Sequence, residues 1–236
     1  MKGEAAAGFS GFKPEAFQFL VDLAMNNDRS WFQPRKGDYE RLLKEPLEAL
    51  CAAVDGEFKA RGIPLSADPA RSPFRIYRDV RFSADKSSYK TAMSASFPWT
   101  AAGRGVGGYL SIQPGACYLG GGMWHPAPAR LTAWRAMVVG DRDRVHAILG
   151  EPAFRSTFGA VEGDSLKRAP SGYSPDDPDI ELLKLKDVTF GRRLSDAEAA
   201  SADLPATIAT TLGVAVPLLE LLASLPGEDA VGSQRG

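Results

Sequence analysis

The pattern of apolar and polar positions divides the chain into helical and extended regions. Near the start, one apolar stripe follows the 3.6-residue period and predicts a helix from Pro14 to Met25, with proline in its favoured first turn. A longer helical pattern covers about residues 39–61. Pro46 should kink or split this second helix, and Gly62 should cap its end.

The middle of the chain changes to a period of two. Alternating apolar positions recur from Phe74 to Leu119, and clusters of Gly, Pro and Ser separate them at hairpin-like distances. This pattern predicts a central, mainly antiparallel sheet over about residues 74–119. With helices expected before and after it, the fold class is α+β, a single domain with N-terminal and C-terminal helices flanking the sheet.

The C-terminal half returns to helical patterns. A helix should begin at Pro128, and Ser195 with Glu198 three residues later forms a capping box for another. Residues 204–225 continue as helix, with Pro217 as the expected interruption.

Nothing in the composition marks a boundary between domains. We find no internal repeat and no shift in composition, so we expect one domain over residues 11–225. Residues 1–10 and the small, polar tail 226–236 are expected to be flexible ends.

Composition and charge exclude several classes of protein. The 236 residues are 44% hydrophobic and carry a net charge of -1, so a packed core is expected and no overall field attracts nucleic acid or membranes. The most apolar stretch, Leu212 to Leu225, is interrupted and is shorter than the ~20 residues of a membrane span. We therefore expect a cytoplasmic protein without a membrane partner, in which Cys51 and Cys117 are buried thiols.

The sequence contains no known catalytic or cofactor-binding motif in the structural context that such a motif requires. Gly103 to Gly108 satisfies G-x-G-x-x-G, but a strand is expected after these glycines, whereas a dinucleotide site needs a helix there. The only histidines, His125 and His146, lie on different predicted elements. No metal site and no cofactor are expected.

One segment, residues 71–90, is unusually basic. It holds six basic and two acidic residues, a local charge of +4. If residues 74–82 form a strand, Arg78 and Phe82 lie on its apolar face. We interpret both as structural, and Arg78 should then have a carboxylate or carbonyl partner, because an unpaired buried charge is costly.

The opposite face of this strand is the predicted binding site. Arg75 and Arg81 flank Asp79 there, an arrangement able to hold a phosphate or carboxylate, with Lys86 or Lys90 assisting. The candidate catalytic groups are Asp79 and Asp85 as proton acceptors and Tyr89 as a donor.

A second glycine-rich stretch is a further candidate for ligand binding. Gly120, Gly121 and Gly122 precede Trp124 and a proline-started helix, and consecutive glycine amides can converge on an anion near a helix N-terminus. The alternative is a bend that lets a strand end against the next helix.

The basic segment also carries a family resemblance. The pattern RxxRDxRFxxDKxxY, from Arg75 to Tyr89, resembles the signature of the DUF2461 family of conserved hypothetical proteins. Residues 26–32 and 166–173 look similar to that family too. The resemblance implies one domain over nearly the whole chain and no catalytic assignment; Asp177 stands where the family pattern implies histidine.

Three functions remain open. In the first, the chain is a binding protein or an enzyme whose ligand is a small phosphate or carboxylate, held by Arg75, Arg81 and Lys86. Alternatively, it is a nucleic-acid-binding module, or the basic segment is a structural ion-pair network in a protein that serves a protein–protein contact. The sequence leaves the oligomeric state and the question of enzyme activity open.

Overall fold

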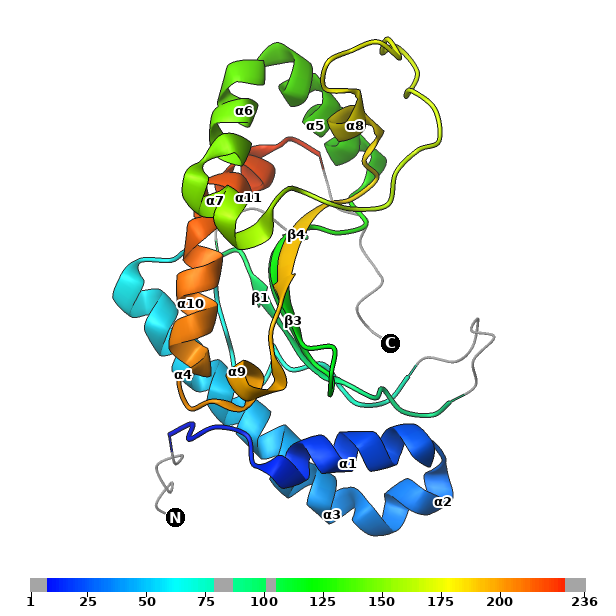
Figure 1. Cartoon of the computed structure of the whole chain (residues 1–236), viewed down its shortest axis with the longest axis vertical. Coiled ribbons are helices and arrows are strands. Elements are labelled where there is room, and N and C mark those ends of the chain that lie inside the picture. Colours follow the sequence, from blue (N-terminus) through cyan, green and yellow to red (C-terminus); the bar gives the residue numbers. More distant parts are fainter. Residues whose placement is uncertain (1–7, 79–86, 101–104, 228–236) are drawn as a thin grey trace.

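The computed structural model describes residues 8–78, 87–100 and 105–227. It is an α+β fold with a single four-stranded antiparallel sheet in the order β1-β2-β3-β4, which confirms the predicted class. The strands are β1 (Met93–Pro98), β2 (Val106–Ile112), β3 (Tyr118–Met123) and β4 (Val188–Arg193). Figure 1 shows the sheet at the centre of a C-shaped chain, with α1 to α3 at one end and α5, α6 and α8 at the other.

The N-terminal helices follow the predicted boundaries. Helix α1 spans Pro14–Met25, as expected from its apolar stripe. After α2 (Arg29–Phe32), η1 (Gln33–Arg35) and α3 (Lys36–Tyr39), the chain widens into one π-helical stretch, η2 (Glu40–Lys44), before α4 (Glu45–Arg61). Pro46 explains the widening, because its ring clashes with a carbonyl group of the preceding α-helical turn and it has no N–H to donate. Gly62 caps α4 with a φ of 65°.

The C-terminal helices also match their local signals. They are α5 (Pro128–Gly140), α6 (Arg142–Gly150), α7 (Pro152–Phe158), α8 (Ile180–Lys184), α9 (Asp196–Ala200), α10 (Leu204–Val214) and α11 (Val216–Ser224). The capping box of Ser195 and Glu198 is formed at α9. The expected interruption near Pro217 is a 58° bend between α10 and α11.

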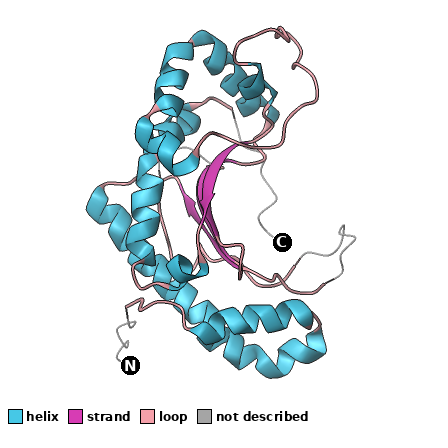
Figure 2. Ribbon diagram, viewed as in Figure 1, coloured by secondary structure: helices cyan, strands magenta, loops and turns pink. Residues whose placement is uncertain are grey.

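One face of the sheet is packed against helices. Helices α4, α7, α10 and α11 contact the strands, and Figures 1 and 2 show them along one side of the sheet. Leu110, Leu119 and Phe190 are fully buried on this side, and Leu212 of α10 lies directly above Gly108. The core therefore sits between the sheet and these helices.

Two expectations about the sheet needed correction. The predicted strand over residues 74–82 is not a regular strand in its described part. Among the described residues of this region, only isolated bridges form, from Pro73 to Ala95 and from Tyr77 to Tyr89. Pro73 supplies a reason, because it cannot donate to the ladder beside β1. The sheet also extends beyond residue 119, since β4 pairs with β3 from a position more than sixty residues later in the chain.

The buried cysteines and the glycine motif agree with their expected structural roles. Cys51 and Cys117 are free and buried, and burial raises the pKa of their thiols to about 12 and about 11. Both remain protonated at neutral pH. Gly107 and Gly108 lie inside β2 rather than before a helix, which removes the dinucleotide interpretation.

No single helix among the described residues has the length and hydropathy of a membrane span, although the bent pair α10 and α11 together reaches both.

Candidate functional site

The face of the sheet turned away from the helices carries small and hydroxylated side chains. The strand register arranges them in three rows across the sheet, because alternate residues of each strand share a face. The rows are Pro98, Gly107, Gly122 and Thr189; then Ser96, Tyr109, Gly120 and Gly191; then Ser94, Ser111, Tyr118 and Arg193. We call this surface the open face.

The glycines of the open face have a structural role. A methyl group at Gly120 would collide with the carbonyl oxygen of Phe190, and one at Gly122 with that of Val188. Neighbouring strands therefore approach too closely for a side chain at these positions. Because β3 is a central strand, the backbone groups of Gly120, Gly121 and Gly122 belong to its ladders with β2 and β4. We leave these glycines out of the site proposed below.

Trp124 follows β3 and is, among the described residues, the most exposed aromatic side chain near the sheet. It is 66% exposed, and its ring contacts His125 edge to face at 4.3 Å. His125 has a φ of 47°, uncommon for a residue other than glycine, and its N–H donates to the Asp187 carboxylate at 2.6 Å. The buried Asp187 thus holds the turn that presents Trp124 to solvent.

Two cations meet at the β1 edge of the open face. Residues 72–74 pair with β1 through hydrogen bonds from Ser96 N to Ser72 O and from Phe74 N to Ser94 O. The chain then pairs with residues 88–90, where Lys90 N donates to Ile76 O at 2.7 Å, so Arg75 lies near Lys90. Burial and then the charge of Arg75 lower the pKa of Lys90. Neither side chain forms an ion pair with a described residue, so within the described part of the chain the two like charges have no acidic partner.

Aromatic and hydroxyl groups surround this pair of cations. The Lys90 ammonium lies 5.2 Å from the centre of the Phe74 ring, which contacts Tyr109 edge to face at 6.1 Å. The Tyr109 hydroxyl donates to Ser94 Oγ at 3.2 Å, and Ser94 Oγ lies 3.5 Å from Ser111 Oγ. The cations are therefore bordered by polar oxygen atoms of the open face that can serve as ligand partners.

The tyrosine at the end of the signature pattern is buried. Tyr89, a candidate proton donor, is only 2% exposed, and its ring stacks on Phe32 at 4.1 Å. The side chain of Asn27 binds the backbone of Tyr89 twice, donating to its carbonyl and accepting from its N–H, each at 2.9 Å. Tyr89 thus joins the basic segment to α2, and the motif over residues 26–32 is the other half of the same contact.

The structure places only part of the predicted site. Arg78 is half-buried, and its guanidinium donates to Ser87 Oγ at 2.6 Å. The structural role of Arg78 stays a prediction. Five candidates, Asp79, Arg81, Phe82, Asp85 and Lys86, lie outside the described residues. Of the predicted ligand-binding residues, the structure brings together Arg75 and Lys90.

A second polar cluster was not predicted. Arg142 of α6 holds Asp177 at 3.0 Å and the nearly buried Asp179 at 2.6 Å, and His146 lies 2.7 Å from Asp179. Asp177, where the family pattern implies histidine, therefore serves as a partner of Arg142. The one sequence signal for this cluster is the four-residue spacing of Arg142 and His146, which places both on the same face of α6.

The comparisons with known proteins agree with the sequence resemblance. A family model described as "conserved hypothetical protein (DUF2461)" matches residues 15–220. No curated protein and no solved structure matches. Within the described parts of the chain, no three His, Cys, Asp or Glu side chains are grouped so that they could hold a metal ion.

Proposed function

Because this chain belongs to the DUF2461 family, whose description names no activity, we propose from its geometry that it binds a small phosphate or carboxylate ligand at Arg75 and Lys90. The observation that carries the proposal is the juxtaposition of Arg75 and Lys90, set by the hydrogen bond from Lys90 N to Ile76 O at 2.7 Å, without an acidic partner in the described chain. Two like charges at a partly desolvated site are unfavourable, and an anion bound between them would relieve this repulsion.

The surroundings support a ligand of modest size. Arg75 is exposed and can form bidentate bonds, while Lys90 is half-buried and fixed over Phe74. Tyr109, whose ring contacts Phe74, is 38% exposed and places a hydroxyl group on the open face beside this cluster. Arg81 and Lys86 belong to the same segment, and we include them in the proposal as further cations. We propose no reaction.

Thermal stabilisation by inorganic phosphate and citrate tests this proposal. A ligand at 100 times its dissociation constant should stabilise the protein by about 2.7 kcal/mol. Arg75→Ala should weaken binding at least about tenfold, because a hydrogen bond to a charged group contributes roughly 1.5–3 kcal/mol. Arg71→Ala is the matched control, since Arg71 lies in the same basic segment but is 88% exposed and pairs with Asp68.

Lys90→Met separates binding from stability. The folded-state pKa of Lys90 is below its ordinary value, so the folded state binds fewer protons than the unfolded state in the interval between them. Stability should therefore rise with pH across that interval, and at neutral pH the charged Lys90 should lower it. Lys90→Met should raise the melting temperature of the free protein and lose most of the phosphate response.

The pH dependence of binding has the same origin. An anion needs protonated Lys90, so phosphate affinity should fall as the pH rises through the lowered pKa of Lys90, and this dependence should vanish in Lys90→Met. Equal phosphate responses in wild type, Arg75→Ala and Lys90→Met would contradict the site.

Nucleic-acid binding is the main competing function, and the same assay distinguishes it. A short single-stranded oligonucleotide is included beside phosphate and citrate. Stabilisation by the oligonucleotide alone, lost steeply as salt increases, would indicate a nucleic-acid-binding module. No response to any anion would leave the basic segment as a structural network.

A further inference from the structure

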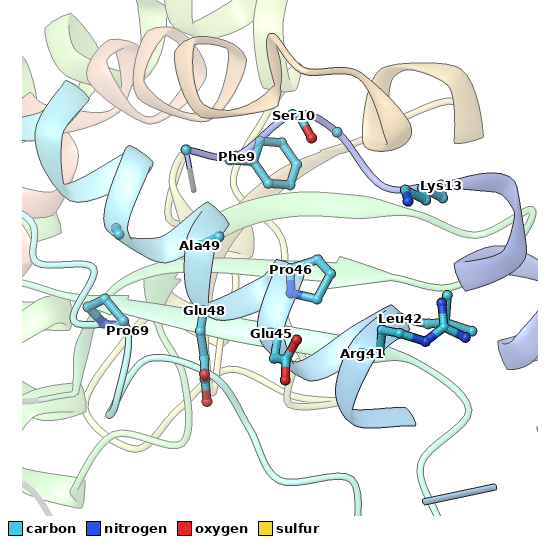
Figure 3. Close-up of a pocket in the computed structure, with 13 residues that line it drawn as sticks. Phe9, Ser10, Lys13, Arg41, Leu42, Glu45, Pro46, Glu48, Ala49 and Pro69 are labelled. Carbon is cyan, nitrogen blue, oxygen red and sulfur yellow. The ribbon is translucent and has the colours of Figure 1, made fainter. Parts of the chain in front are cut away.

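A second candidate site lies away from the open face, between residues 8–13 and helix α4. The pocket there has a volume of about 630 Å³ and is shown in Figure 3. This volume falls within the roughly 300–1,000 Å³ of small-molecule sites. Residues 8–13, which we call the strap, precede the part of the chain that the family model matches.

The strap is fixed by contacts with the C-terminal end of α9 and with the core. Phe12 is buried, its N–H donates to Ala200 O at 3.0 Å, and the Phe9 ring packs edge to face on it at 5.2 Å. Gly11 has a φ of 95° and lies so close to Ala200 that a side chain would not fit. The strap is therefore anchored to the core just before α1 begins.

The backbone of the strap is available for pairing. Within the described part of the chain, the N–H groups of Phe9, Ser10 and Gly11 donate no hydrogen bond. All three residues line the pocket. Unpaired backbone next to a hollow can pair with an extended peptide, as an exposed strand edge does.

The remaining walls supply an apolar floor and a positive end. Leu42, Pro46, Ala49 and Ala52 of η2 and α4 form the floor. Figure 3 shows Phe9 facing Pro46 across the pocket, Lys13 and Arg41 at the same end, and the carboxylates of Glu45 and Glu48 directed away from the strap. Lys13 has no ion pair within the described chain, whereas Arg41 also holds Asp38 at 2.9 Å.

We propose that this pocket binds the free C-terminal end of a peptide or protein whose last residue is apolar. The terminal carboxylate would lie against Lys13 and Arg41, the apolar side chain between Phe9 and Pro46, and the peptide backbone beside the strap. A carboxylate suits the positive end by charge, and only a peptide would also use the unpaired backbone of Phe9, Ser10 and Gly11.

Calorimetric titration with two forms of one peptide tests the proposal. Acetyl-Ala-Val-Leu with a free carboxylate should bind at least tenfold more tightly than the same peptide with a C-terminal amide. Lys13→Gln should remove most of the preference for the acid, because the remaining cation, Arg41, also holds Asp38. Lys36→Gln, which removes an exposed lysine outside the pocket, should change neither affinity.

A steric variant gives a second, independent readout. Ala52 is an exposed residue of the pocket floor, so Ala52→Trp should preserve the melting temperature and abolish peptide binding. Equal binding of acid and amide, or no binding of either, would overturn the proposal. Decanoate binding as tightly as the peptide acid would also overturn it, because decanoate cannot pair with the strap. The phosphate response at Arg75 should be unchanged in Lys13→Gln, which separates the two proposals.

Discussion

At the residue scale, the signature segment divides into groups that build the fold and groups that face solvent. Tyr89 is buried against Phe32 and tied to Asn27, whereas Arg75 is exposed. A pattern that resembles one motif in sequence thus contains both kinds of position. Substitutions at the two kinds should have opposite signatures: loss of stability at the first and loss of ligand response at the second.

Asn27 provides the sharpest test of the structural half. Asn27→Ala removes both hydrogen bonds to the Tyr89 backbone and should destabilise the protein by about 1–3 kcal/mol. For a chain of this size each kcal/mol lowers the melting temperature by roughly 2–4 °C. Asn26→Ala is the control, because the Asn26 side chain is exposed and binds only Asp22 O of its own helix. Equal melting temperatures for the two variants would show that the Asn27 contact is not needed.

At the element scale, most boundaries are explained by local chemistry. Pro46 accounts for the π-helical stretch before α4, and the left-handed Gly62 accounts for its end. The capping box at α9 satisfies backbone donors that the first turn of a helix leaves unpaired. These devices act within a few residues, which is why they can be read from sequence.

The capping box predicts a pH-dependent contribution to stability. Hydrogen bonds from the backbone and hydroxyl of Ser195, and then from Arg192, lower the pKa of Glu198. A lowered folded-state pKa stabilises the protein above the unfolded pKa, and the contribution is lost as the pH falls through the folded pKa. Glu198→Gln should therefore melt below wild type at neutral pH and equally at a pH below both values.

Ser195→Ala provides the comparison for that experiment. Loss of this cap should cost about 1 kcal/mol. Part of the cost should persist in acid, because the Ser195 hydroxyl also accepts from Glu198 N whatever the state of the carboxyl group. A difference between Glu198→Gln and wild type that does not change with pH would contradict the pKa assignment.

At the scale of the whole molecule, the buried side chains form one continuous core. It includes residues from α1, α4, the four strands and α5 to α11. We therefore expect a single cooperative unfolding transition, and this transition would test the prediction of one domain over residues 11–225. Circular dichroism and tryptophan fluorescence should report the same midpoint in guanidinium chloride.

Two tryptophans can report whether the two ends of the molecule unfold together. Trp134 is buried in α5, and Trp31 lies beside Phe19 at the opposite end of the molecule. Variants that keep only Trp31 or only Trp134, with the other three of the four tryptophans replaced by Phe, should each give a fluorescence transition that coincides with the circular dichroism. Separate midpoints for the two variants would divide the chain into two units.

The sequence by itself determined the α+β class, the helix from Pro14 to Met25, the break at Pro46 and the capping box at Ser195. Periodicity, proline geometry and capping are local, so they act before distant segments meet. It also located the basic segment that contains Arg75 and Lys90.

Only the tertiary structure decided what lies beside that segment. The pairing of β4 with β3, the Asn27 contact with Tyr89 and the strap over α4 each join residues far apart in the chain. The proximity of Arg75 to Lys90 depends on how residues 72–78 leave β1 after Pro73. Such contacts follow from packing and register across the fold, and no short stretch of sequence specifies them.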